Sequence, residues 1–269
     1  MEGFNGTVFA YGQTSSGKTH TMLGPNITDE AERGMIPRMV SHIFEEIANA
    51  PQEMEFQVTV SMVEIYMEKV HDLINPSAQN LKIREEKGKG VFIENVTEIY
   101  VTEEGEVYQI MLQGSDNRSI SATDMNARSS RSHTCFIVTV KQSNLKTFSS
   151  QTGQLYLVDL AGSERIEKTG AKGKLLEEAN MINKSLTNLG KVINQLTDGK
   201  STHIPYRDSK LTRILQESLG GNARTSLIIT CSPAKYNLDE TLGTLRFGAR
   251  AKRVKNRAKV NKELTIQEV

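Results

Sequence analysis

Hydrophobic residues along this chain follow two different periodicities, which together predict a mixture of strands and helices. Short apolar runs between turn-forming residues predict buried strands at 6–11, 135–140, 155–158 and 226–231. Alternation of apolar and polar residues predicts a half-buried strand at 56–62. Apolar residues at helical spacing predict helices at 35–48, 103–113, 175–196 and 240–253. Because strands alternate with helices and no repeat or low-complexity linker separates them, we expect one α/β domain.

Length and composition narrow the class of protein. The chain has 269 residues, of which 37% are hydrophobic and 24% charged, so it can bury a large core and is neither disordered nor fibrous. It has no run of eighteen apolar residues and no signal-peptide pattern, so we expect a soluble protein that is not secreted. Its two cysteines, Cys135 and Cys231, lie in separate apolar runs, which argues against a disulfide framework and fits a reducing compartment.

The net charge of +1 conceals an uneven distribution of charge. Residues 199–262 contain 14 Lys and Arg against 4 Asp and Glu, whereas residues 1–198 contain 19 against 26. A basic C-terminal quarter on an acidic chain suggests a patch that meets an acidic partner. A solvated helix face explains the same count equally well, so charge alone does not decide.

The strongest chemical signal follows the first predicted strand. It is the sequence Gly12-Gln13-Thr14-Ser15-Ser16-Gly17-Lys18-Thr19, which matches G-x-x-x-x-G-K-[ST] between a strand and a helix. Glycines allow successive backbone N–H groups to turn toward phosphate oxygens, and the positive end of the following helix adds to the attraction. Lys18 can reach the β- and γ-phosphates, and the Thr19 hydroxyl can ligate Mg²⁺. We therefore predict a nucleotide-phosphate site.

Two further segments have the residue types that such a site needs. The apolar strand at 155–158 is followed by Asp159, which can hold Mg²⁺ through water, and by Gly162, whose N–H can approach a γ-phosphate. Between the two glycine loops, residues 126–133 read Asn-Ala-Arg-Ser-Ser-Arg-Ser-His. Their consecutive hydroxyls can meet a phosphate, a metal or a water molecule, and Arg131 can pair with Glu164. An exposed loop explains this serine segment almost as well.

Taken together and in order, these motifs resemble the three nucleotide elements of a kinesin motor domain. The similarity continues through Asn183-Lys184-Ser185-Leu186, through 205–213 and through 218–222, and so covers almost the whole chain. It implies a P-loop NTPase-type central sheet flanked by helices, in the kinesin motor fold. Residues 1–256 would be the motor domain. Residues 257–269 resemble the neck linker of conventional kinesin heavy chains, which implies plus-end-directed movement.

The resemblance implies a role for each residue of these motifs. Gly12 to Thr19 would hold the phosphates of ATP, with His20 beside the adenine ring. Thr19, Ser130 and Asp159 would contact Mg²⁺. The catalytic set would comprise Ser129, Ser130, Arg131, Asp159, Gly162 and Glu164. Within this set, Ser129 and Ser130 would face metal and attacking water, Gly162 would sense the γ-phosphate, and Arg131 would form an ion pair with Glu164.

The resemblance also gives the charge asymmetry a partner. Family contacts with tubulin correspond here to what we call the basic face, which comprises Arg165, Lys168, Lys172, Lys174, Arg207, Lys210 and Arg213. Because tubulin is strongly acidic, this face would steer docking to microtubules and weaken with salt. The implied setting is the cytoplasmic cytoskeleton, with no nucleic acid or membrane as partner and a parent protein that dimerises through a stalk.

The chain departs from the family at its start. Family motor domains have a first strand and an Arg/Pro adenine-binding segment before the phosphate loop, whereas here the loop begins at residue 12. The resemblance therefore implies an N-terminally truncated motor whose adenine pocket lacks one wall and whose sheet has an unpaired edge or apolar face. Two functions remain open, namely a microtubule-stimulated ATPase and a catalytically inactive microtubule-binding module. A P-loop GTPase or small-molecule kinase is disfavoured because the chain has no guanine-selective N-K-x-D sequence.

Overall fold

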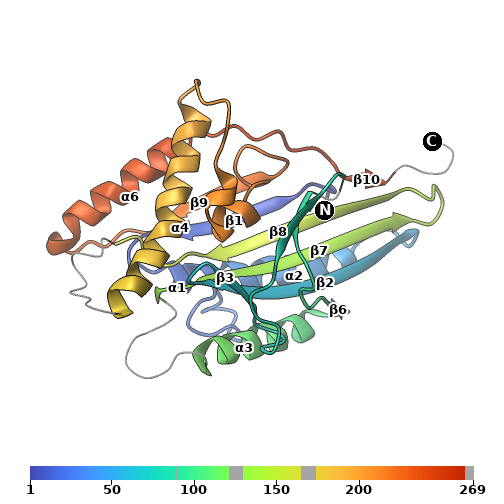
Figure 1. The fold of residues 1–269 in the computed structure, drawn as a ribbon. Helices are drawn as coiled ribbons and strands as arrows, with labels where there is room; N and C mark the ends of the chain where they lie inside the picture. Colours follow the sequence, from blue (N-terminus) through green and yellow to red (C-terminus); the bar gives the residue numbers. More distant parts are fainter. Residues whose placement is uncertain (89, 121–129, 165–173, 264–269) are drawn as a thin grey trace.

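A mixed β-sheet runs through the centre of the molecule, and helices cover both of its faces (Figure 1). The computed structural model describes residues 1–88, 90–120, 130–164 and 174–263. The main path of the sheet has the order β3 (Lys69–Asp72), β2 (Met54–Tyr66), β7 (His133–Asn144), β8 (Ser150–Asp159), β1 (Gly6–Tyr11) and β9 (Arg224–Ile229). β1 runs parallel to both of its neighbours, whereas β2, β7 and β8 pair antiparallel. The central α/β sheet predicted from the sequence is therefore confirmed.

Four short strands of the described chain lie outside the main path of the sheet. β6 (Ile99–Val101) pairs with β2, and β10 (Lys262–Glu263) pairs with β8. A separate hairpin consists of β4 (Ile83–Glu86) and β5 (Gly90–Ile93). The sequence pattern did not predict β3 to β6, because three or four residues are too few to establish a periodicity.

Each face of the sheet packs against its own group of helices. One face carries α1 (Lys18–Met22), α2 (Met35–Ala48) and α3 (Glu104–Ile120). The other carries α4 (Lys174–Thr197), α5 (Lys210–Ile214) and α6 (Leu238–Ala251), with single 3₁₀ turns η3 (Tyr206–Asp208) and η4 (Lys235–Asn237). Successive side chains of a strand point to opposite faces, so Val8 and Ala10 join the first core and Phe9 joins the second. None of the described helices has the length and apolar composition needed to cross a bilayer.

Helix α3 and strand β2 differ from the prediction, the first in length and the second in burial. α3 continues to Ile120, well beyond residue 113, because its polar end makes buried contacts that apolar periodicity cannot reveal. For example, Asn117 donates a 2.7 Å hydrogen bond to the carbonyl of Leu73. The half-buried strand expected at 56–62 is confirmed for residues 56–59, where burial alternates, but it is wrong from Val60 on, because Val60 to Ile65 of the longer β2 are buried on both faces. β2 is an inner strand, and both of its faces are covered along this second half.

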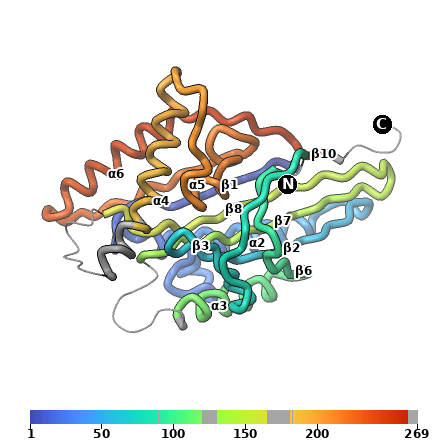
Figure 2. Tube along the Cα trace, in the orientation of Figure 1, coloured from blue at the N-terminus to red at the C-terminus, as the bar shows by residue number. Residues whose placement is uncertain are grey.

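The N-terminal residues and the last described residues lie side by side (Figure 2). Phe4 forms an antiparallel bridge with Val260, and the Asn261 N–H donates to the carbonyl of Gly3 at 2.9 Å. The Asn261 side chain donates to the Asn5 amide oxygen (2.8 Å). These contacts continue into β10, so residues 260–263 run along the sheet in extended form.

One open edge of the sheet lies at β9. Within the described part of the chain, β9 is the last strand of the path and pairs only with β1. A cavity of about 550 Å³ lies beside it and is lined partly by the apolar residues Phe9, Leu227, Ile229 and Val254. The sheet therefore presents an open edge together with apolar surface on this side.

Candidate functional site

The glycine-rich loop and the predicted acidic residue meet at one edge of the sheet. Because β1 and β8 are parallel neighbours, their carboxyl ends lie together, and Ala10 stands opposite Asp159 in the register. The loop 12–17 therefore emerges beside the segment that follows β8. In open α/β sheets this carboxyl edge is where ligands bind.

Two glycines allow the loop to fold tightly. A Cβ on Gly12 would collide with the carbonyl oxygen of Thr230, so a larger residue does not fit there. Gly17 has a φ of 97°, a left-handed conformation that glycine adopts without strain, and it precedes the first residue of α1. Since α1 has only five residues, an anion bound in this loop would be held mainly by Lys18 and the loop backbone and less by the helix dipole.

Lys18 is a buried cation aimed into the loop. Its side chain is 7% exposed, and Nζ donates to the carbonyls of Gly12 (2.9 Å) and Gln13 (2.8 Å). Burial lowers the pKa of Lys18, while Asp159 and Glu164 oppose that shift. Because the low-dielectric surroundings disfavour the ammonium charge, an anionic ligand in the loop would stabilise it.

Asp159 has one satisfied oxygen and one unsatisfied oxygen. Oδ2 accepts a 2.6 Å hydrogen bond from the Thr19 hydroxyl, whereas Oδ1 is buried without a hydrogen-bond partner. Burial raises the pKa of this carboxyl, and the Thr19 hydrogen bond, Arg118 and Lys18 oppose the rise. A buried carboxylate oxygen without a partner is unfavourable in the protein alone, so Asp159 and Thr19 fit a site that is completed by a cation or its water.

The segments that carry Ser130 and Gly162 are in contact with each other and with the phosphate loop. The Gly162 N–H donates to the Ser130 carbonyl at 2.9 Å, and the Ser163 N–H donates to the Gly12 carbonyl at 3.1 Å. In this structure the Gly162 N–H is thus engaged by the protein. A γ-phosphate would have to replace the Ser130 carbonyl as its acceptor, which would move the two loops relative to each other.

Glu164 contacts the phosphate loop directly. Its two carboxylate oxygens accept from the Thr14 N–H (2.7 Å) and the Thr14 hydroxyl (2.6 Å). A Cβ on Gly162 would collide with both the Glu164 carboxylate and the Thr14 hydroxyl, which explains a glycine at this position. Arg131 is half-buried, and its ion pair with Glu164 stays a prediction.

Other predicted residues vary in their surroundings. The Ser16 hydroxyl lies 2.7 Å from that of Thr230, whereas Ser15 and His20 are exposed. Gln13 is 7% exposed, and its Oε1 is buried without a hydrogen-bond partner. Ser129 lies outside the described residues.

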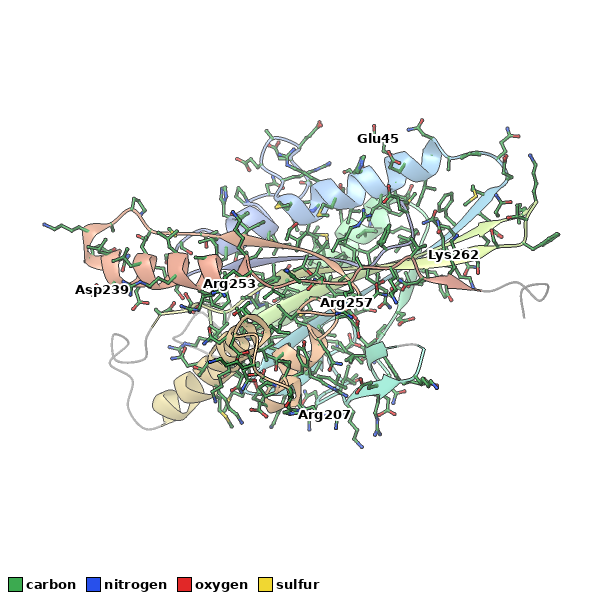
Figure 3. The ribbon with its side chains drawn as sticks, turned by 90° about the horizontal axis from the view of Figure 1, so that it is seen from above. Glu45, Arg207, Asp239, Arg253, Arg257 and Lys262 are labelled. Carbon is green, nitrogen blue, oxygen red and sulfur yellow. The ribbon has the colours of Figure 1, made fainter. Side chains whose placement is uncertain are left out.

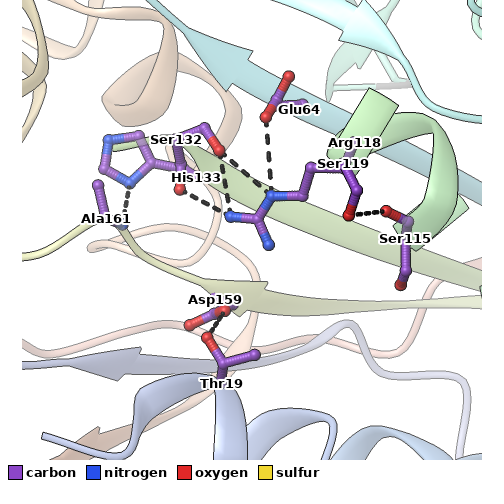
Figure 4. Close-up of polar contacts among 9 residues, drawn as sticks. All are labelled: Thr19, Glu64, Ser115, Arg118, Ser119, Ser132, His133, Asp159 and Ala161. Atoms are coloured by element: carbon purple, nitrogen blue, oxygen red, sulfur yellow. Dashed lines mark hydrogen bonds and ion pairs between the residues drawn. The ribbon is translucent and has the colours of Figure 1, made fainter. Parts of the chain in front are cut away.

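Sequence reasoning missed two buried residues behind the site (Figure 4). Arg118 of α3 donates to the backbone carbonyl and the hydroxyl of Ser132, both at 3.1 Å, and lies 3.7 Å from Glu64 of β2. His133, the first residue of β7, is 2% exposed and contacts the backbone N–H of Ala161. His133 closes the serine-rich motif, and that position was the only available signal. Nothing in the sequence around Arg118 suggested a buried arginine.

The basic face is only partly within the described structure. Arg165, Lys168 and Lys172 lie outside the described residues, as does the side chain of Lys174, the first residue of α4. Arg207 has an exposed side chain (78%) and lies on the opposite side of the sheet from Glu45 of α2 (Figure 3).

The two remaining members of the basic face are more enclosed. Lys210 is half-buried, and its backbone N–H donates to Glu68. Arg213 is 13% exposed and donates to Glu85 at 2.7 Å, so its charge is largely engaged within the protein.

Comparisons with known proteins agree with this geometry. A family model described as the kinesin motor domain matches residues 1–254. The chain is 62% identical over 267 residues to a kinesin heavy chain of Syncephalastrum racemosum, covering 99% of this chain and 29% of that protein. It is 59% identical over 271 residues to kinesin-related protein 3 of Dictyostelium discoideum, covering all of this chain and 23% of that protein.

A solved structure of a fast kinesin, described for its ATPase mechanism and its interactions with microtubules, has 58% sequence identity and a TM-score of 0.92. The match covers all of this chain and 76% of that one. The chain thus spans about 29% of the length of the curated kinesin heavy chain that it resembles at 62% identity.

Proposed function

This chain belongs to the kinesin motor domain family, and on that premise we propose that it hydrolyses ATP when stimulated by microtubules and drives movement along them. The supporting observation is the meeting of three motifs at one edge of the sheet, with the buried Lys18 at its centre. Phosphoryl transfer needs mostly positioning and charge neutralisation, and this arrangement supplies both. The kinesin relatives do not favour the alternative of a catalytically inactive binding module.

The residues of the phosphate loop fit a nucleotide triphosphate. Lys18 gains from a nearby anion because burial disfavours its charge, and the glycines leave the backbone of 12–17 accessible to phosphate oxygens. The Lys18 ammonium would exchange its loop carbonyl partners for the β- and γ-phosphates. His20 would lie beside the adenine.

Thr19, Ser130 and Asp159 would hold Mg²⁺. When bound, this ion neutralises charge on the terminal phosphates. The described residues contain no group of three or more His, Cys, Asp or Glu side chains suited to a metal ion. That absence fits Mg²⁺, which is usually held by one carboxylate, water and the substrate's own phosphates. The unsatisfied Oδ1 of Asp159 is the oxygen that such an ion or its water would engage.

The remaining motif residues would detect the γ-phosphate and position water. Ser129 and Ser130 would face the metal and the attacking water, and Arg131 would pair with Glu164 once Glu164 has left Thr14. The Gly162 N–H would give up its hydrogen bond to the Ser130 carbonyl and donate to a γ-phosphate oxygen instead. These exchanges would order both loops when ATP is bound and release them after hydrolysis.

The mechanical parts lie away from the nucleotide. The basic face would bind the acidic surface of microtubules, and residues 257–269 would act as a neck linker that docks along the sheet. We place the protein on the cytoplasmic cytoskeleton, moving toward the plus end, in a parent that dimerises through a stalk. We propose neither a nucleic acid nor a membrane as a partner.

Two measurements on the chain test this function. Calorimetry with ATP and Mg²⁺ should show binding, and phosphate release should rise when polymerised tubulin is added. Salt-sensitive pelleting with microtubules but without turnover would instead support the inactive binding module. The proposal is wrong if well-folded protein takes up no ATP in the presence of magnesium.

A further inference from the structure

His133 joins three elements that are far apart in the sequence. It begins β7, and its Nδ1 accepts a hydrogen bond from the backbone N–H of Ala161, which follows β8, at 2.9 Å (Figure 4). Its Nε2 lies 2.6 Å from the hydroxyl of Ser185 in α4. Because Nδ1 accepts from a backbone N–H, the ring proton must be on Nε2, and His133 therefore donates to Ser185.

The imidazole is held in this single protonation state. Burial, together with the nearby charges of Arg118 and Lys18, lowers the pKa of His133 to about 3. Both ring nitrogens are used, and the side chain is 2% exposed. His133 is therefore a fixed connector at neutral pH, with one bond to each of two neighbouring elements.

Both ends of this connector lead to functional regions. Ala161 precedes Gly162, whose N–H donates to the Ser130 carbonyl. On the other side, Asn188 lies one helical turn beyond Ser185 and donates to the carbonyl of Asp208 at 3.0 Å. Asp208 follows the exposed Arg207 in η3. A series of hydrogen bonds, joined by one turn of α4 and by the backbone of η3, thus runs from the edge of the nucleotide site to the basic face.

We infer that His133 is a positioning residue that couples α4, and through it the basic face, to the segment preceding Gly162. A change in the Ser130–Gly162 contact would shift Ala161, then the imidazole, and then α4. The role in microtubule stimulation rests on the proposed function, whereas the coupling between Ala161 and Ser185 does not. Coupling of this kind is measured as a change in energy or rate at one end after a substitution at the other.

Two substitutions interrupt the connector at its α4 end. Ser185→Ala removes the partner of Nε2. In His133→Asn, the amide oxygen can take the place of Nδ1 and keep the Ala161 bond while losing Ser185. Ser185→Thr keeps the hydroxyl and should rescue. Thr197→Ala is a matched control, because the Thr197 hydroxyl of the same helix donates to Ile193 and Asn194 within α4.

The first readout is hydrogen exchange at the amide of Ala161, measured without nucleotide. We expect Ser185→Ala to accelerate this exchange about 5-fold or more, and we expect Ser185→Thr and Thr197→Ala to leave it unchanged. Unchanged exchange in the folded Ser185→Ala protein would overturn the coupling. This readout does not depend on whether the chain is a motor.

The second readout is the ratio of microtubule-stimulated to basal phosphate release. We expect Ser185→Ala and His133→Asn each to lower the ratio about 5- to 10-fold, and the double variant to lower it no further. Basal release should stay within about twofold of the parent chain. Additive losses, or an unchanged ratio in a chain that microtubules do stimulate, would overturn the inferred role. If the parent chain shows no stimulation while the exchange effect is present, the proposed function fails and the coupling stands.

Discussion

Charged residues at the carboxyl edge of the sheet are held differently from those on the basic face. Lys18 and Asp159 are 7% and 3% exposed. Burial lowers the pKa of Lys18 and raises the pKa of Asp159, so in each case it favours the neutral form. Arg207 is 78% exposed and is surrounded by solvent that screens its charge. Single buried charges should therefore decide nucleotide chemistry, whereas exposed charges should act together and each contribute little.

The largest effect should follow from removing the buried cation. We expect Lys18→Ala to lower microtubule-stimulated phosphate release by about 100-fold or more, because the variant loses the buried ammonium group that donates to the loop carbonyls. Steady-state turnover measures the loss. Lys146→Ala is the control, since Lys146 is 74% exposed in the β7–β8 hairpin and should leave turnover unchanged. Equal activity in the two variants would contradict the claim that the buried charge matters more than an exposed one.

Acid should destabilise the fold through His133. Its folded-state pKa of about 3 lies below the unfolded value of about 6.5, so the unfolded chain binds the proton first. The stability that the neutral His133 contributes is therefore fully present above about pH 7 and is lost as the pH falls from there toward 3. We expect a loss of roughly 2 kcal/mol at pH 5 from this residue.

Urea unfolding of the parent chain and of His133→Asn at pH 7.5 and 5 isolates the histidine contribution. The variant should show the smaller change between the two pH values. The raised pKa of Asp159 acts with opposite sign, but it is present in both proteins and largely cancels in the difference. Parallel pH dependences would show that His133 does not carry the effect.

A smaller effect should separate two arginines that bind the same carboxylate. Arg213 is 13% exposed and Arg207 is 78% exposed, and both donate to Glu85. We expect Arg213→Ala to lower the free energy of unfolding by about 1 kcal/mol and Arg207→Ala to lower it by less than about 0.5 kcal/mol. Denaturant melts of the two variants provide the measurement. The reverse order would mean that burial does not set the strength of these pairs.

The smallest effect should be that of a single exposed charge on track binding. We expect Arg207→Ala to weaken binding to microtubules about 2- to 3-fold at low salt, with the difference disappearing as salt is raised. Cosedimentation at several ionic strengths provides the test. A loss of binding that does not depend on salt would contradict this prediction, because it would indicate that Arg207 is buried on binding and that solvent does not screen its charge.

The predicted elements that proved accurate are those with long apolar patterns. The helix at 35–48 has the predicted bounds, and the long helix at 175–196 lies within α4. The end of α3 could not be predicted, because Asn117 and Arg118 contribute buried hydrogen bonds that no hydrophobic periodicity reports. β3, β4 and β5 are too short to show a periodicity and pair in local hairpins, whereas β6 and α5 depend on pairing and packing with segments farther along the chain.

In the site, motif spacing identified Lys18, Thr19 and Asp159, and the parallel register of β1 and β8 brings them together. The sequence could not show that Glu164 contacts Thr14, or that the Gly162 N–H contacts Ser130. Such choices among partners depend on the relative positions of loops that are separated along the chain, by 150 residues for Thr14 and Glu164. The role of His133 was missed for the same reason, since its partners come from two other elements.

By itself, the sequence determined the alternation of strands and helices, the phosphate loop and the positive charge of the C-terminal quarter, because each depends on residues that are close along the chain. Only the tertiary structure decided which charges are buried, which carboxylate oxygen lacks a partner, and which histidine joins the nucleotide edge to α4. Those properties arise from desolvation and from hydrogen bonds between distant segments, and neither exists until the sheet and its helices have packed.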